Sequence, residues 1–176
     1  MGACGSLMLD SEQIKDWTKE FKSRSDGSLL LNTWIPDPEP IRDSHHEKQL
    51  MKFLSRFVPD MSNSCTNVSN VCFEEQCQAM LDADPNVISS IMGLFEPSLV
   101  RELKERKIKW FATVTSVSEA IIAEKAGADA LVVQGSEAGG HRGNFYTDYD
   151  HSVGLMALLP TVSDAVTIPI IATGGI

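Results

Sequence analysis

Hydrophobic and polar positions along the chain follow two periodicities that take turns. Short runs rich in β-branched residues, typical of buried strands, alternate with stretches whose apolar residues recur every three to four positions, as in amphipathic helices. Strands joined by helices of about ten residues predict an α/β protein with a parallel sheet and right-handed crossovers. The strands are predicted at 3–8 (a short one), 29–35, 86–92, 108–114, 129–135 and 168–173, and the helices at 10–27, 41–57, 73–81, 97–107, 116–125 and 155–165.

Two of the helix starts have the spacing of a capping box. In this motif the first side chain accepts a bond from the backbone three residues later, and the side chain found there bonds back to the first residue. Asp10 with Gln13 and Ser116 with Glu119 have this spacing. Gly127 is expected to end the second of these helices in a left-handed conformation.

The alternation is interrupted between residues 36 and 72. Pro36, Pro38 and Pro40 exclude regular structure, the helix at 41–57 is polar and amphipathic, and residues 59–70 are rich in Ser and Asn. This excursion begins at the C-terminal end of a strand, and in a (β/α) barrel that end belongs to the active-site face. We therefore expect one domain over residues 1–176, with the 36–72 excursion near the active-site face.

Two strands run directly into glycines at their C-terminal ends. Residues 136–143 read Ser-Glu-Ala-Gly-Gly-His-Arg-Gly, and Gly174-Gly175 follow the last strand. Glycine leaves backbone N–H groups open to a phosphate, so the pattern favours a barrel that binds a phosphorylated cofactor at this face. The 176 residues are few for a complete eight-stranded barrel, which takes about 250. We therefore expect an incomplete TIM (β/α)8 barrel.

Several polar residues lie where such a barrel places its chemistry. Gln134 ends a strand, and its amide could contact a ring edge of a cofactor or satisfy loop backbone. Asn32 lies among leucines, so it needs a partner, either a cofactor or a neighbouring strand or loop. His141 follows two glycines at a strand's C-terminal end and is the candidate catalytic residue.

Charge and hydropathy exclude other classes of function. The formal net charge is −9, and without a basic cluster this argues against a nucleic-acid partner. No apolar run approaches the roughly 20 residues of a membrane span. Residues 1–6 match the N-myristoylation pattern, although a strand tail with its following loop is the preferred interpretation. No membrane association is expected.

Cysteines and histidines show no metal-ligand spacing. No Cys-x-x-Cys pair is present, which favours reduced thiols in a cytoplasmic protein and no metal site. The adjacent His45 and His46 are interpreted as part of a solvated helix face. The cysteines are Cys4, Cys65, Cys72 and Cys77.

The two glycine-containing segments together closely resemble the nitronate monooxygenase family, formerly called 2-nitropropane dioxygenases. The resemblance is carried by residues 133–143 and 168–176, and the segments 86–93, 115–117 and 126–130 stand in the family's order and spacing. It implies an FMN-dependent TIM-barrel enzyme whose partners are an alkyl nitronate and O2, and whose products are a carbonyl compound and nitrite. It further implies FMN contacts at Asn32, Gln134 and Gly139, phosphate binding at Gly174 and Gly175, and His141 as the active-site histidine.

The chain also departs from the family's pattern. The family's first strand, with its flavin loop containing proline and methionine, is missing, as are the Ala-Asp-Gly-Arg segment expected after Ile176 and the last strand. We therefore interpret the chain as a fragment, and its open edges are compatible with a homo-oligomer. Two alternatives remain: a flavin-dependent enoyl-acyl-carrier-protein reductase, which shares the barrel and a similar glycine-histidine loop, and an inactive barrel remnant that acts as an interaction module.

Overall fold

The computed structural model describes residues 1–38, 41–57, 71–146 and 152–176 and divides the chain into two compact units. The larger unit comprises residues 1–36 and 72–176, and the smaller one comprises residues 37–71. The division falls at the predicted limits of the excursion. The Ser- and Asn-rich stretch at 59–70 lies outside the described residues.

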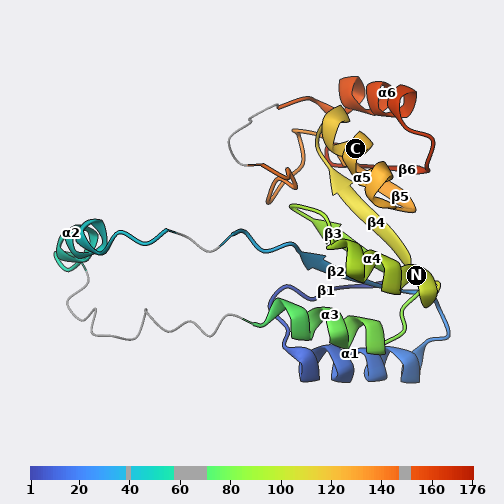
Figure 1. Cartoon of the computed structure of the whole chain (residues 1–176), viewed down its shortest axis with the longest axis horizontal. Coiled ribbons are helices and arrows are strands. Elements are labelled where there is room, and N and C mark those ends of the chain that lie inside the picture. The colour runs from blue at the N-terminus through green and yellow to red at the C-terminus, as the bar shows by residue number, and fades with distance from the viewer. Residues whose placement is uncertain (39–40, 58–70, 147–151) are drawn as a thin grey trace. The chain divides into compact units, whose positions relative to one another are not determined.

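The larger unit contains a six-stranded sheet in which every strand is parallel to its neighbours and lies next to the strand that follows it in the sequence (Figure 1). The five later strands begin and end within two residues of their predicted limits. The strands are β1 (Gly2–Gly5), β2 (Leu29–Trp34), β3 (Val87–Ile91), β4 (Lys109–Val114), β5 (Ala130–Gln134) and β6 (Ile170–Thr173).

The first strand is shorter than predicted. It ends at Gly5 because a turn follows, closed by the Leu9 N–H donating to the Ser6 carbonyl at 3.0 Å. The Gly2 N–H donates to the Ser28 carbonyl at 2.8 Å, and the strand pairs with β2. The N-terminus is therefore a barrel strand with its following loop, as the preferred interpretation held.

In the described part of the larger unit, five helices accompany the sheet: α1 (Ser11–Arg24), α3 (Phe73–Asp82), α4 (Pro97–Glu105), α5 (Val117–Ala126) and α6 (Leu155–Ala165). The hydrophobic core includes fully buried side chains from helices and strands alike, among them Ile14, Met80, Leu103, Trp110 and Leu131. Buried positions along β2 alternate with half-buried ones, and Asn32 and Trp34 are half-buried. Because side chains on a strand alternate between faces, Asn32 and Trp34 share the less covered face of the sheet.

The capping predictions have different outcomes at the two helices. At α1 the full box is present: Asp10 accepts from the Gln13 N–H at 2.9 Å, and the Gln13 side chain accepts from the Asp10 N–H at 3.0 Å. Ser25 caps this helix two residues before the predicted end at Gly27. At α5 the Ser116 hydroxyl accepts from the Glu119 N–H at 3.2 Å and Gly127 takes the left-handed φ of +102°, but the Glu119 side chain bonds elsewhere. The predicted box is therefore only half correct.

The smaller unit contains helix α2 (Ser44–Leu54), whose Asp43 side chain accepts from the His45 and His46 N–H groups. His45 and His46 are exposed, as interpreted from the sequence. No residue of α2 is buried, and Phe53 and Phe57 contact each other with ring centroids 5.3 Å apart.

Candidate active site at the C-terminal ends of the strands

Gln134, the last residue of β5, holds the glycine-rich loop that follows it. Its Nε2 donates to the His141 carbonyl at 3.1 Å, and its Oε1 accepts from the Gly143 N–H at 2.8 Å. The side chain is thus bound to loop backbone, one of the two roles that the sequence left open. Each atom retains one more donor or acceptor position, so a second bond to a flavin stays a prediction.

The loop crosses the C-terminal ends of the neighbouring strands. A Cβ on Gly143 would lie 2.9 Å from side-chain atoms of Ile91 on β3 and Thr113 on β4, so this position has no room for a side chain. Two residues before Gly143, the same loop brings the exposed His141 to β2. The His141 ring meets Trp34, the last residue of β2, with centroids 4.7 Å apart and an interplanar angle of 65°.

Trp34 is a residue of the candidate site that reasoning from sequence missed. It ends β2, which is three strands away from β5, the strand that the His141 loop follows, and no local sequence spacing connects the two residues. One signal was available: Trp34 ends a strand two residues after Asn32 and therefore shares its face. The edge-to-face contact confines one side of the imidazole and leaves the ring exposed elsewhere.

Glu119 joins the loops that follow β4 and β5. Its Oε2 accepts from the Thr115 N–H at 2.6 Å and from the Thr115 hydroxyl at 3.0 Å, and its Oε1 accepts from the Phe145 N–H at 2.9 Å. The residue is only 6% exposed. A glutamate three residues after a capping serine indicates a capping box, so the sequence did not suggest that the Glu119 carboxylate bonds to Thr115 and Phe145 instead.

Gly139 and Gly140 leave space in which a ligand could approach their backbone atoms. Among the described residues other than the chain neighbours, no atom lies within 4 Å of the position that a Cβ would take at either glycine, so packing against these residues does not require glycine here. Gly140 has a φ of +80°, which orients its N–H group as only glycine readily allows. The loop next to His141 therefore leaves room for a ligand atom to approach its backbone at these two glycines.

Gly174 and Gly175 lie against the same loop. Both have positive φ values, +83° and +78°, and a Cβ would clash with Ala138 at the first position and Glu137 at the second. The Glu137 carboxylate in turn accepts from the Leu155 N–H at the start of α6. This backbone bond is the main reason that the pKa of Glu137 is lowered. The two glycine segments thus form one contiguous surface, whose backbone N–H groups suit a phosphate.

Asn32 bonds to the neighbouring strand. Its Nδ2 donates to the Ser89 Oγ at 2.9 Å and to the Ser89 carbonyl at 3.4 Å. This is one of the two partners that the sequence allowed, and it leaves Oδ1 as the atom that can meet a ligand. An FMN contact there stays a prediction.

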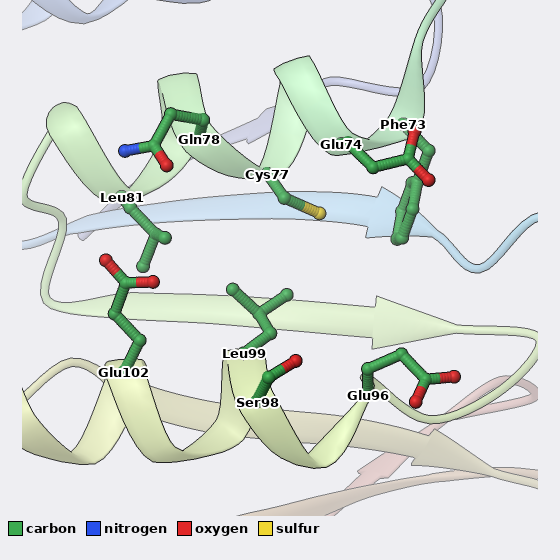
Figure 2. Close-up of a pocket in the computed structure, with 9 residues that line it drawn as sticks. All are labelled: Phe73, Glu74, Cys77, Gln78, Leu81, Glu96, Ser98, Leu99 and Glu102. Carbon is green, nitrogen blue, oxygen red and sulfur yellow. The ribbon is translucent and has the colours of Figure 1, made fainter.

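A separate groove of about 290 Å³ lies between α3 and α4, away from these residues. Figure 2 shows Cys77 and Leu81 of α3 pointing toward Leu99 of α4, with Glu74, Glu96 and Glu102 around them. Burial is the main cause that raises the pKa of Cys77, to about 12, which keeps this thiol protonated and poorly nucleophilic. The groove contains none of the candidate site residues.

The described residues contain neither a cluster suited to a metal ion nor a helix suited to a membrane. Among these residues, no group of three or more His, Cys, Asp or Glu side chains is arranged to hold a metal ion. None of the helices is both long and apolar enough to cross a membrane. The three cysteines in this part of the chain, Cys4, Cys72 and Cys77, are free thiols.

The parallel sheet in chain order, with its glycine loops at the C-terminal ends of the strands, defines part of a TIM-type (β/α) barrel. The model of the nitronate monooxygenase family matches residues 3–176. The chain therefore belongs to the nitronate monooxygenase family, as the sequence resemblance indicated.

Individual sequences and solved structures are similar to this chain over its whole length. "Probable nitronate monooxygenase" sequences from Staphylococcus aureus strain JH9 and Staphylococcus saprophyticus are 32% and 30% identical over the whole chain, which spans 51% of each. The nitroalkane oxidase structure from Streptomyces ansochromogenes is 26% identical with a TM-score of 0.83, and all of this chain aligns with 51% of it. FabK from Thermotoga maritima is 25% identical with a TM-score of 0.69, and all of this chain aligns with 43% of it. The chain thus spans about half the length of the curated relatives it matches.

Proposed function

We propose that the protein acts as an FMN-dependent nitronate monooxygenase, which oxidises alkyl nitronates with O2 to a carbonyl compound and nitrite. Membership of the family supports the proposal. The observation that carries it is the exposed His141 imidazole, held beside Trp34 next to the open glycines of its loop. A reacting group beside a loop with accessible backbone at this end of the strands is the arrangement that barrel enzymes use.

FMN would be held mainly by backbone. Gly139 has open space beside its backbone, and the N–H groups of Gly174 and Gly175 would donate to the phosphate oxygens. Gln134 and Asn32 would add side-chain bonds to the flavin ring edge. FMN, when bound, supplies the electron transfer and the reaction with O2.

His141 would recognise the nitro group of the substrate. A nitronate is an anion, so its oxygens need a donor or a positive charge, and the N–H of an imidazole is such a donor. A neutral nitroalkane would instead need a base to remove its proton, which an imidazole can also supply. Trp34 would confine one side of the ring and so restrict its orientations.

Replacing His141 by asparagine tests this role. In the complete gene product, we expect His141→Asn to lower nitrite release per bound flavin by about 10²–10⁴-fold, the usual cost of losing a general acid or base. FMN content should stay close to that of the wild type, because the flavin contacts are assigned to other residues. A variant that loses flavin but keeps its activity per flavin would show that His141 is a cofactor ligand.

A flavin-dependent enoyl-acyl-carrier-protein reductase is the second candidate, because that branch shares the barrel and a similar glycine-histidine loop. Gln134 directly before Gly135 favours the monooxygenase. The two functions differ in the reductant: NAD(P)H reduces the flavin of the reductase, and the nitronate reduces the flavin of the monooxygenase.

A further inference from the structure

The short segment that carries His141 is held by two buried side chains. Gln134 binds its backbone at His141 and Gly143, and Glu119 binds it at Phe145. Three of five consecutive residues are therefore fixed through backbone atoms by side chains from β5 and α5. The His141 ring itself is positioned by its contact with Trp34.

Glu119 has the chemistry of a rigid tether. Its carboxylate accepts three bonds, two from Thr115 at the end of β4 and one from Phe145. Because Glu119 is only 6% exposed, water competes weakly for its carboxylate oxygens. A neutral amide of the same shape has only one accepting oxygen, so it would turn a donor toward either the Thr115 N–H or the Phe145 N–H.

We propose that Glu119 is a positioning residue for His141: by fixing the Phe145 backbone to the β4–α5 turn, it places the His141 imidazole against Trp34 and toward the substrate. This inference rests on the proposed function. It adds a residue that acts through the loop and touches neither cofactor nor substrate.

The same helix provides a matched control. Glu124, also on α5, accepts from the Thr167 N–H at 2.6 Å, the Thr167 hydroxyl at 2.8 Å and the Ile168 N–H at 3.2 Å. Glu119 and Glu124 therefore each join a threonine N–H, a threonine hydroxyl and one further backbone N–H. They differ in location, because Thr167 precedes β6, at the opposite end of the strands from His141.

The test compares Glu119→Gln with Glu124→Gln in the flavin-loaded complete gene product. We expect Glu119→Gln to lower kcat with an alkyl nitronate by about 10- to 100-fold, the scale of a displaced reacting group, with unchanged FMN content. Amide hydrogen exchange over residues 141–146 should rise in this variant. Glu124→Gln should leave kcat and exchange in that segment unchanged. All three bonds of Glu124 go to Oε1, so the single amide oxygen of the variant can keep them, and exchange around residues 167–168 should change little.

Each outcome decides the inference. Raised exchange over 141–146 with unchanged kcat would overturn it, as would an equal loss of kcat in Glu124→Gln. If Glu119→Gln does not fold, Glu119→Asp, which keeps the charge but shortens the reach to Phe145, should show the same pair of changes, and unchanged kcat would again overturn the inference. A wild-type protein that releases no nitrite would refute the proposed function instead, and the exchange comparison would still show whether Glu119 holds the loop.

Discussion

At the scale of single residues, the glycines of the site have two different physical roles. Gly135, Gly143, Gly174 and Gly175 are required by packing, since a Cβ at each would lie within 3.0 Å of a neighbouring atom. Gly139 and Gly140 have open space around them instead. A substitution at Gly139 can therefore separate cofactor binding from folding.

We predict that Gly139→Ala leaves the stability of the flavin-free protein within about 0.5 kcal/mol of the wild type, as is usual for substitutions without a clash. Its affinity for FMN should fall, because the added methyl group lies where the flavin would approach. Gly135→Ala is the matched comparison: its Cβ would lie 2.8 Å from the Leu155 backbone nitrogen, so it should destabilise the fold. Urea unfolding and FMN titration measure the two effects, and unchanged FMN affinity in Gly139→Ala would remove Gly139 from the cofactor site.

At the same scale, reasoning from sequence indicated which residues lie at the candidate site better than it identified the partners of those residues. Gln134 and His141 were recognisable because a strand ending in glycines marks the C-terminal edge of a barrel. Trp34 and Glu119 were not, since their partners are far away in the sequence or are backbone groups of another loop. Such contacts depend on how far the 135–145 loop extends across β4 and β3, and no local pattern encodes that path.

At the scale of elements, the predicted order of strands and helices is confirmed, because each strand and helix carries its own periodicity and punctuation. The side-chain contacts that connect these elements could not be predicted from the sequence. Asp129, just before β5, binds Lys104 of α4 at 2.6 Å, Lys109 of β4 at 3.0 Å and the Trp110 N–H at 2.9 Å. One carboxylate thus links three consecutive elements at the N-terminal ends of the strands.

Asp129 predicts a dependence of stability on pH. Burial alone would raise its pKa, but the bonds from Lys104, the Trp110 N–H and Lys109 outweigh burial and lower the pKa below the ordinary 3.8. A carboxyl group with a lowered pKa stabilises the fold above its unfolded pKa, and this contribution disappears as the pH falls through its folded pKa.

We therefore expect Asp129→Asn to reduce the free energy of unfolding by about 0.5–2 kcal/mol near neutral pH. The difference from the wild type should shrink as the pH falls below 3.8. Urea unfolding across the pH range measures this, with the exposed Asp16→Asn on α1 as the control. A difference that stays constant into acid would show that the charge of Asp129 does not stabilise the fold.

At the scale of the whole molecule, the described sheet has two edges. β1 and β6 each have one neighbouring strand, and Ile171 of β6 is 42% exposed. The chain spans about half the length of its curated relatives. Unpaired strand edges with apolar side chains favour association.

A polypeptide of only these 176 residues is therefore expected to aggregate or self-associate, and to bind FMN poorly. Each fully exposed large aliphatic side chain forfeits about 1.5–3 kcal/mol, out of a margin of about 5–15 kcal/mol for a typical domain. Size-exclusion chromatography with light scattering, together with the flavin absorbance per chain, measures both properties. A soluble monomer with stoichiometric flavin would contradict this expectation.

The central claim, that the protein oxidises nitronates through a bound flavin, is tested most directly by reducing that flavin. The complete gene product, loaded with FMN, is mixed without oxygen with an alkyl nitronate and, separately, with NADH. We predict that the nitronate bleaches the flavin absorbance, that NADH does not, and that admitting O2 restores the absorbance with release of nitrite. Rapid bleaching by NADH, with no nitrite released from the nitronate, would contradict the account and favour the reductase.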